Sequence, residues 1–218
     1  HGHRNFLGNV DHMVIEEYSC PGMKIAMQNL LSEIRGCEVC KEHLPLGPRP
    51  IVSGTPQSKI ILVSQAPGRK AHDQNKAWDD PSGRKLREWL GVSDAQFFNP
   101  DNFAVLPMGF CYPGKGATGD LPPRRECAPL WHPKLWEHFG NVKLIILIGK
   151  YAQDQYLGKD SKKNLTENVR NYTDFLPNIF PLPHPSPVNH FWRGKNPWFE
   201  DEVVGELQKL IAQLLNEQ

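Results

Sequence analysis

The sequence predicts an α/β protein, a three-layer α/β/α sandwich around a central sheet of about four parallel strands. Four short apolar runs lack polar–apolar alternation, as expected for strands that are covered on both faces. These runs are residues 59–64, 103–106, 144–149 and 179–183. Segments with helical periodicity lie between them, and a strand–helix alternation implies parallel pairing through right-handed crossovers.

Two helices are expected in the first half of the chain. In residues 23–35 apolar side chains recur at helical spacing, and Gly36 follows them as a stop signal. The predicted apolar face consists of Ile25, Leu30, Leu31 and Ile34. Asp80 followed by Pro81 is a typical N-cap and first helical residue, and Gly91 ends this second helix.

Two further helices are expected in the second half. Residues 151–157 form the first of them, and Gly158 ends it. The other begins at Asn196-Pro197 and continues to the end of the chain. Its predicted apolar face consists of Phe199, Val203, Leu207, Leu210, Ile211 and Leu214.

The composition is that of one globular domain. The chain has 218 residues, 39% of them hydrophobic, which is enough for one sizeable core. Its 25 Lys and Arg residues against 24 Asp and Glu residues exclude a strongly basic coat protein, but not a local patch for nucleic acid. We expect residues 23–218 to form this domain. Residues 1–22 form an N-terminal extension, and its first three residues resemble the remnant of an expression tag.

No segment of the sequence indicates a membrane protein or an exported one. The longest aliphatic run, residues 144–148, is far shorter than the roughly 20 residues of a membrane-spanning helix. No secretory signal is recognisable near the N-terminus. We therefore expect a cytoplasmic protein that has no membrane partner.

The first candidate motif, SQAPG at residues 64–68, directly follows the first strand. In a parallel sheet of this kind, ligands bind beyond the carboxyl ends of the strands. Proline and glycine make a tight turn there and let the backbone approach a ligand closely. A backbone amide or the Gln65 side chain can then position a water or a carbonyl. The alternative is an ordinary strand-to-helix turn.

The second candidate motif, HPSP at residues 184–187, directly follows the last strand. Its two prolines hold His184 and Ser186 in one pose. An imidazole in this place can donate a hydrogen bond to an oxygen that gains negative charge, and Ser186 can hold a phosphate. The alternative is a rigid loop with a surface histidine.

Together the two motifs resemble those of the uracil-DNA glycosylase superfamily, and the resemblance covers roughly residues 24–216. It implies an α/β/α fold and a DNA-repair glycosylase that hydrolyses the N-glycosidic bond of a deaminated or damaged base, uracil or a related one. It also implies DNA as the partner of a monomeric enzyme. One alternative is a non-catalytic relative that recognises damaged or single-stranded DNA. Another is an enzyme for a different nucleic-acid or nucleotide substrate, with the site remodelled around residues 107–110.

Four cysteines have the spacing of a metal site. Cys37 and Cys40 form a C-x-x-C pair, and Cys111 and Cys127 have fifteen residues between them. Four thiolates suit an iron–sulfur cluster or tetrahedral zinc. The spacing is similar to the iron–sulfur branch of the glycosylases, which implies a structural [4Fe–4S] cluster that holds loops beside the DNA. Zinc is the alternative metal, and four buried thiols without any metal are a further alternative. Cys20 remains unassigned.

Two departures from the family pattern concern the chemistry. The best-studied uracil enzymes carry a carboxylate in the first motif, where this chain has Gln65 and Ala66. Asp73, Asp79 and His72 are the candidate replacements. The uracil readers also carry an asparagine after the second strand, where this chain has Pro107 or Met108. The identity of the excised base therefore stays open.

The resemblance assigns roles to the remaining candidate residues. His184 stabilises the leaving base, and Gln65 or a backbone group of the 65–68 turn positions water. Asp80 is expected only to cap its helix. Substrate-binding residues are Ala66, Pro67, Gly68, Trp78, Ser186 and Asn189. Trp78 is expected to stack on a flipped base, and its alternative is a core tryptophan.

The loop of residues 184–198 is basic and rich in aromatic residues, as strand insertion requires. Phe191 or Trp192 can fill the gap that a flipped nucleotide leaves, and Arg193 and Lys195 can meet phosphates. The alternative is that these aromatic residues pack on the last helix.

Overall fold

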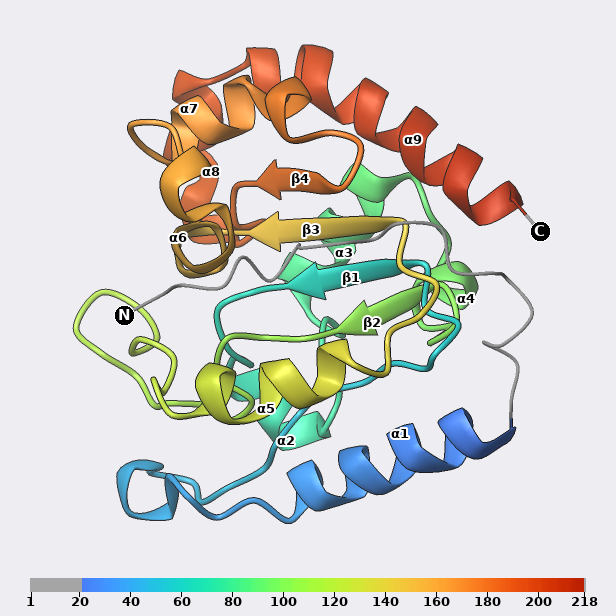
Figure 1. The fold of residues 1–218 in the computed structure, drawn as a ribbon. Helices are drawn as coiled ribbons and strands as arrows, with labels where there is room; N and C mark the ends of the chain where they lie inside the picture. The colour runs from blue at the N-terminus through green and yellow to red at the C-terminus, as the bar shows by residue number, and fades with distance from the viewer. Residues whose placement is uncertain (1–20, 218) are drawn as a thin grey trace.

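Four parallel strands form the central sheet of the computed structural model, in the order β2-β1-β3-β4 (Figure 1). The strands are β1 Ile60–Val63, β2 Phe103–Val105, β3 Leu144–Ile148 and β4 Ile179–Leu182. All four predicted strands and their parallel pairing are thereby confirmed. The structure describes residues 21–217. Most of the predicted N-terminal extension, with Cys20, lies outside the described residues.

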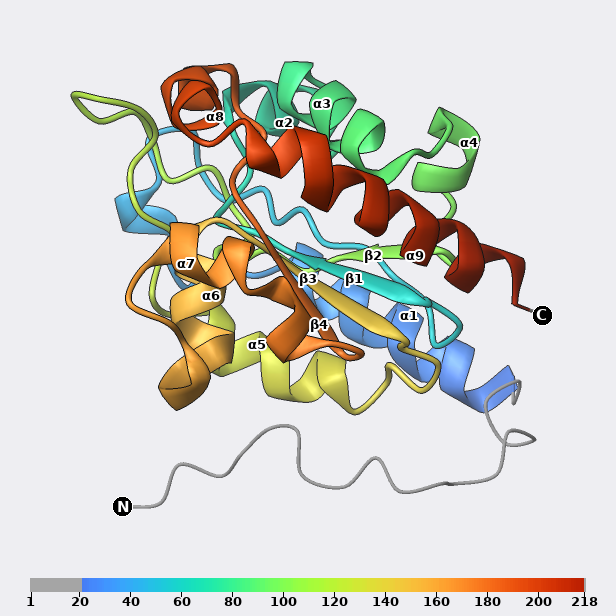
Figure 2. The same cartoon turned by 90° about the horizontal axis from the view of Figure 1, so that it is seen from above.

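Helices cover both faces of the sheet. On one face α1 Pro21–Arg35, α5 Cys127–Trp136 and α6 Lys150–Leu157 pack against alternate strand residues such as Ile61 and Ile145. On the other face α3 Pro81–Leu90, α4 Asp94–Phe97 and α9 Val204–Asn216 pack against the intervening residues such as Ile60 and Ile146 (Figure 2). Every residue of β1, β3 and β4 is buried, which explains the absence of alternation in these strands.

Shorter elements complete the described chain. They are α2 Arg69–Gln74, α7 Leu165–Arg170, α8 His190–Lys195, the 3₁₀ turns η1 Lys41–His43, η2 Gly158–Asp160, η3 Tyr172–Phe175 and η4 Pro187–Asn189, and the π-helical turn η5 Phe199–Val203. The last predicted helix therefore reaches a regular α-helical form only from Val204 onward. Within residues 21–217, every helix is too short or too polar to cross a lipid bilayer.

The apolar face of α1 differs from the predicted one at one position. Ile25 is 57% exposed, whereas Met27 is only 1% exposed and takes its place in the core. Met27, Leu30, Leu31 and Ile34 follow one another at the spacing of a single helix face, and Ile25 lies off that face. The prediction of Ile25 as a core residue was wrong for this reason.

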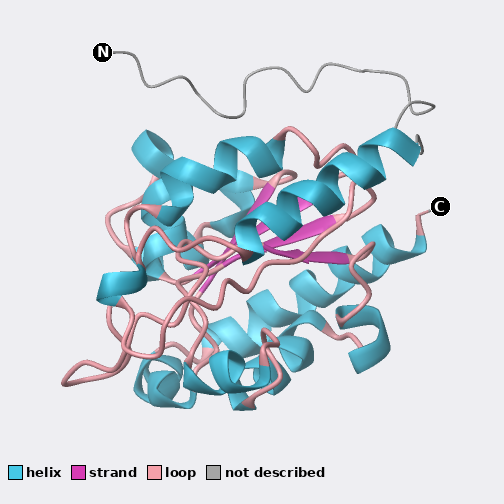
Figure 3. Cartoon of the chain, turned by 90° about the horizontal axis from the view of Figure 1, so that it is seen from below, coloured by secondary structure: helices cyan, strands magenta, loops and turns pink. Residues whose placement is uncertain are grey.

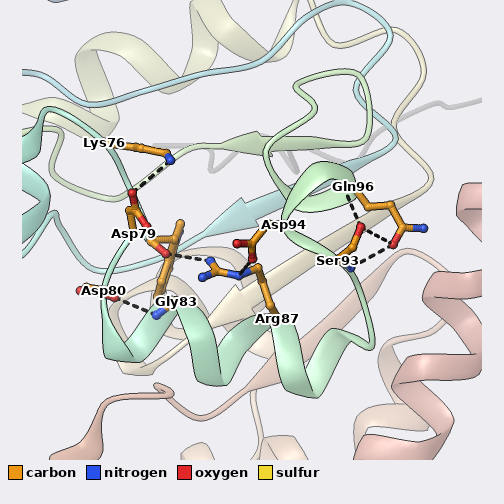
Figure 4. A network of polar contacts seen from close by, with 9 residues as sticks. Lys76, Asp79, Asp80, Gly83, Arg87, Ser93, Asp94 and Gln96 are labelled. Carbon is orange, nitrogen blue, oxygen red and sulfur yellow. Dashed lines mark hydrogen bonds and ion pairs between the residues drawn. The ribbon is translucent and has the colours of Figure 1, made fainter.

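The predicted start of α3 is confirmed in atomic detail. The Asp80 carboxylate accepts a hydrogen bond of 2.7 Å from the Gly83 N–H, as expected of an N-cap (Figure 4). At the other end Gly91 has the left-handed conformation (φ 66°) that favours glycine. Inside the helix Arg87 is buried and forms an ion pair of 2.6 Å with Asp94.

Candidate functional site

The loops that follow the strands gather at one edge of the sheet, where all four arrowheads point in Figure 1 and loops predominate in Figure 3. Beyond β1 and β2 the backbone pairing continues: the Met108 N–H donates to the Ser64 carbonyl at 2.7 Å and the Gly109 N–H to the Gln65 carbonyl at 3.0 Å. Gly149, after β3, lies against His184, since a Cβ there would be 3.7 Å from the His184 Cβ. The first and second motifs thus occupy the same edge.

His184 is held by its own loop. Its Nδ1 accepts a hydrogen bond of 3.2 Å from the Ser186 N–H, and its carbonyl accepts one of 2.8 Å from the Asn189 side-chain amide. Burial lowers the pKa of the imidazole to about 4, and the charge of Asp80 opposes this shift. At neutral pH the ring is therefore uncharged. Because Nδ1 accepts, the ring proton sits on Nε2, which leaves a neutral N–H donor.

The structure brings Trp78 to the same place from a distant part of the chain. Its ring centroid is 5.9 Å from that of His184, with an angle of 33° between the rings. The indole is 8% exposed and belongs to the core on the α3 and α9 face. The interpretation as a core tryptophan therefore holds, and stacking on a base stays a prediction.

The backbone at Trp78 is unusual and tightly held. Its φ of 62° is rare for a bulky residue. The Trp78 carbonyl accepts a hydrogen bond of 2.9 Å from Arg87 Nη1. Gly83 approaches so closely that a Cβ there would lie 1.7 Å from the Trp78 carbonyl oxygen. Strain of this kind persists where the surroundings impose it, and it is frequent at ligand sites.

The first motif forms the turn into α2. Gln65, Ala66 and Gly68 are partly exposed and Pro67 is buried. The Gln65 side-chain amide donates a hydrogen bond of 3.3 Å to the carbonyl of Leu121, in the segment between β2 and α5. Its Nε2 is thereby engaged, while its Oε1 is left as an acceptor.

The predicted replacement carboxylates are both paired with cations. The Arg69 Nε–H lies 2.9 Å from each carboxylate oxygen of Asp73, and Lys76 Nζ is 3.1 Å from Asp79 (Figure 4). His72 is 5% exposed and its Nδ1 has no hydrogen-bond partner within residues 21–217. Burial, followed by the nearby charge of Arg49, lowers the pKa of His72.

The predicted DNA-binding loop divides into exposed and packed residues. Phe191 is 72% exposed, and its ring centroid is 3.9 Å from that of His190, with an angle of 37° between the rings. Trp192 packs inward, where its Nε1 donates a hydrogen bond of 2.9 Å to Thr166 Oγ1. Arg193 lies 3.4 Å from Glu200, whereas Lys195 is exposed and forms no ion pair in the described part of the chain. Phe191 and Trp192 are the two residues predicted to fill the gap left by a flipped nucleotide, and Phe191 is the one whose ring is available.

The four candidate metal ligands come together. Cys37, Cys40, Cys111 and Cys127 line one small cavity with Leu44, Phe110, Arg124 and Trp131. All four are free thiols. Burial raises the pKa of Cys111 to about 11 and that of Cys127 to about 12, so an electropositive centre is needed to make them thiolates. The four thiols are ligands of the type that a metal centre uses, and a metal centre at this place stays a prediction.

A buried hydrogen-bond chain beside the site is absent from the sequence-based expectations. Trp136 Nε1 donates to the Tyr156 hydroxyl at 3.0 Å, and this hydroxyl lies 2.6 Å from His132 Nδ1. His132 Nε2 is 2.9 Å from the carbonyl of Pro107, two residues after the end of β2. These hydrogen bonds therefore fix the backbone at Pro107. No motif marks these residues, since His132 lies in a helix interrupted by proline.

The fold and the site define a parallel α/β protein with a neutral histidine and an aromatic ring at the carboxyl edge of its sheet. A family model described as the uracil DNA glycosylase superfamily matches residues 51–208, which is more than half of the chain. The chain therefore belongs to the uracil DNA glycosylase superfamily. The match extends from before β1 into α9, so both motifs lie inside it.

One solved structure to which this chain is similar is a solution NMR structure from Methanosarcina acetivorans, described as a "putative Uracil DNA glycosylase". The two sequences are 14% identical, and the alignment covers 73% of this chain and 94% of that one, with a TM-score of 0.42.

Proposed function

We propose that the protein is a DNA glycosylase that hydrolyses the N-glycosidic bond of a deaminated or damaged base in DNA. The observation that carries this proposal is His184, a neutral imidazole whose Nδ1 is engaged and whose Nε2–H is a donor, next to the Trp78 ring. A leaving base gains negative charge as its bond to the sugar breaks. A positioned neutral donor stabilises that charge without first losing a proton of its own.

The remaining residues support steps before bond cleavage. A base must leave the DNA stack before an enzyme can act on its glycosidic bond, and an aromatic face stabilises it outside. Trp78 supplies that face in our proposal. Exposed Phe191 fills the gap in the duplex, and Lys195, which has no ion pair within residues 21–217, meets a phosphate.

A [4Fe–4S] cluster bound by the four cysteines is the second part of the proposal. The cluster would supply a structural link between loops and takes no part in the hydrolysis. The support for this part of the proposal is that the four thiols line the wall of one cavity. Within residues 21–217 no group of three or more His, Cys, Asp or Glu side chains is already arranged to hold a metal ion. Zinc stays the alternative to the cluster.

The main alternative is a non-catalytic relative that binds damaged or single-stranded DNA. One observation favours it: the first motif holds no carboxylate, and Asp73 and Asp79 are each paired with a cation. A binder of this kind would keep Phe191 and Lys195 in use but release no base.

A panel of oligonucleotides separates the two functions. Single- and double-stranded DNA with uracil, hypoxanthine, xanthine or a mismatch is incubated with the full chain, and abasic sites are revealed by alkali. We expect cleavage at one class of lesion and its loss in His184→Ala. Binding of the same oligonucleotides, measured by fluorescence anisotropy, should persist in that variant. Binding without any cleavage by the wild-type protein would establish the non-catalytic alternative.

A further inference from the structure

Three aspartates near the first motif are already engaged. Asp73 lies beside Arg69, Asp79 beside Lys76, and Asp80 accepts a hydrogen bond at the start of α3. Each of these carboxylates therefore already has a partner that occupies part of its acceptor capacity and fixes its orientation. They are less free than an unpaired carboxylate to receive a hydrogen bond from water.

A fourth aspartate approaches the first motif from a different part of the chain. Asp120 lies in a small hairpin, where it forms an antiparallel bridge with Lys115. Its Oδ2 is 3.5 Å from the position that a Cβ on Gly68 would occupy. The hairpin is also joined to the motif by the hydrogen bond from Gln65 to Leu121. The Asp120 carboxylate thus lies beside the turn that lacks one.

The surroundings of Asp120 differ from those of its neighbours. Its side chain forms no ion pair or hydrogen bond within residues 21–217, although the charge of Lys115 acts on it. Burial by surrounding atoms raises the pKa of its carboxyl, yet the residue remains exposed to solvent. The carboxylate thus has no side-chain partner among the described residues and is open to water. Such a group suits proton transfer from a water molecule.

We propose that Asp120 supplies the carboxylate that the first motif lacks and acts as the general base for the hydrolytic water. This inference rests on the proposed glycosylase function. The water oxygen forms a bond to C1′ of the deoxyribose, and the C1′–N bond breaks with its electron pair passing to the base. The water gives a proton to Asp120, which later returns it to solvent. The departing base accepts a hydrogen bond from His184 Nε2–H and takes up a proton from solvent.

The arrangement also assigns a precise part to Gln65. Its Nε2 donates one hydrogen bond to the Leu121 carbonyl, which fixes the orientation of the amide. Its Oε1, the acceptor of the side chain, can then receive a hydrogen bond from the same water. Gln65 is thus a positioning residue, while Asp120 takes the proton. A Cβ on Gly68 would lie in ordinary van der Waals contact with Asp120 Oδ2, at 3.5 Å, so a longer side chain there would enter the space between the motif and the carboxylate.

The proposal is tested on the lesion that the wild-type protein cleaves. The rate of base release is measured under single-turnover conditions with the full, metal-loaded protein. We expect Asp120→Asn to lower the rate at least about 100-fold and to leave binding to an abasic-site analogue within about twofold of wild type. Asp120→Glu should restore part of the rate. Asp160→Asn, which removes an exposed charge in η2, is the matched control and should retain the wild-type rate.

The pH dependence separates a base from a merely structural residue. The wild-type rate should fall on the acid side as Asp120 becomes protonated, and this limb should vanish in Asp120→Asn. Equal rates of base release by the wild-type protein and Asp120→Asn would overturn only the assignment of Asp120 as the general base. So would an equally large loss in Asp73→Asn or Asp79→Asn. If the wild-type protein releases no base from any lesion, both the glycosylase function and the assignment of Asp120 as its general base are overturned.

Discussion

At the scale of single residues, the contact between Gly83 and Trp78 sets the shape of the candidate site. Gly83→Ala would place a methyl group 1.7 Å from the Trp78 carbonyl oxygen, a backbone atom that cannot move aside alone. We expect this variant to lose about 3 kcal/mol of unfolding free energy or more, because overpacking displaces both segments. Urea denaturation followed by circular dichroism measures the loss.

Gly205→Ala is the matched control for this prediction. Gly205 lies inside α9, and a Cβ there would meet nothing within 4 Å. Alanine at such a position should stabilise the protein by roughly 0.5–1 kcal/mol. Equal effects of the two substitutions would show that the close approach at Trp78 does not constrain the fold.

Two histidines make the stability depend on pH. Burial lowers the pKa of His132 and of His184 to about 4 in the folded protein, against about 6.5 in an unfolded chain. As pH falls, the unfolded state binds these protons first. The stabilisation is therefore complete above pH 6.5 or so and is lost progressively as pH falls toward 4.

His132→Gln isolates one of these contributions. We expect the variant to be less stable than wild type at pH 8, because glutamine replaces one of the two ring hydrogen bonds at most. Between pH 6.5 and 4 it should lose less unfolding free energy than the wild-type protein. Denaturation at a series of pH values measures both slopes, and parallel slopes would contradict a neutral buried His132.

At the scale of elements, α8 presents one aromatic side chain outward and one inward. Phe191→Ala should leave stability within about 0.5 kcal/mol, because an exposed ring contributes little to the core. Trp192→Ala should cost about 2 kcal/mol, since the indole packs on Trp198 and Phe199 and bonds Thr166. Affinity for lesion-bearing DNA should fall mainly in Phe191→Ala. If Trp192→Ala stays folded and loses more affinity than Phe191→Ala, then Trp192 is the residue that fills the gap in the duplex.

The elements differ in how well the sequence predicts them. Strands buried on both faces give unbroken apolar runs, and all four were predicted; α3 was marked by its Asp-Pro start and its glycine end. The unpredicted helices α2, α4, α7 and α8 have four to six residues, too few for a periodic pattern. Helix α5 contains Pro133, which obscures its helical signal.

At the scale of the whole molecule, the candidate site is assembled from loops that are far apart in the sequence. The motifs after β1 and β4 were predictable because each directly follows a recognisable strand. Asp120 and His132 were not, because their relevance arises only when the segment between β2 and α5 folds back on its neighbours. The spacing of residues along the sequence does not indicate that this segment folds back on its neighbours.

The cysteine cavity joins four separate segments of the fold. Its cysteines come from the segment after α1, the residue before η1, the loop after β2 and the start of α5. A centre bound there would tie the N-terminal helix to the sheet edge that carries the site, and metal binding adds directly to folding free energy. Buried uncharged thiols alone would give no such link.

We therefore expect about four iron atoms and four sulfides per chain in protein purified without oxygen, against one metal ion for zinc. Cys111→Ser should abolish the iron and lower the melting temperature markedly, because a buried ligand is lost. Cys20→Ser, which changes the cysteine not assigned to the cavity, should retain both. Full stability and base release after removal of all metal would show that the four thiols serve only as small core residues.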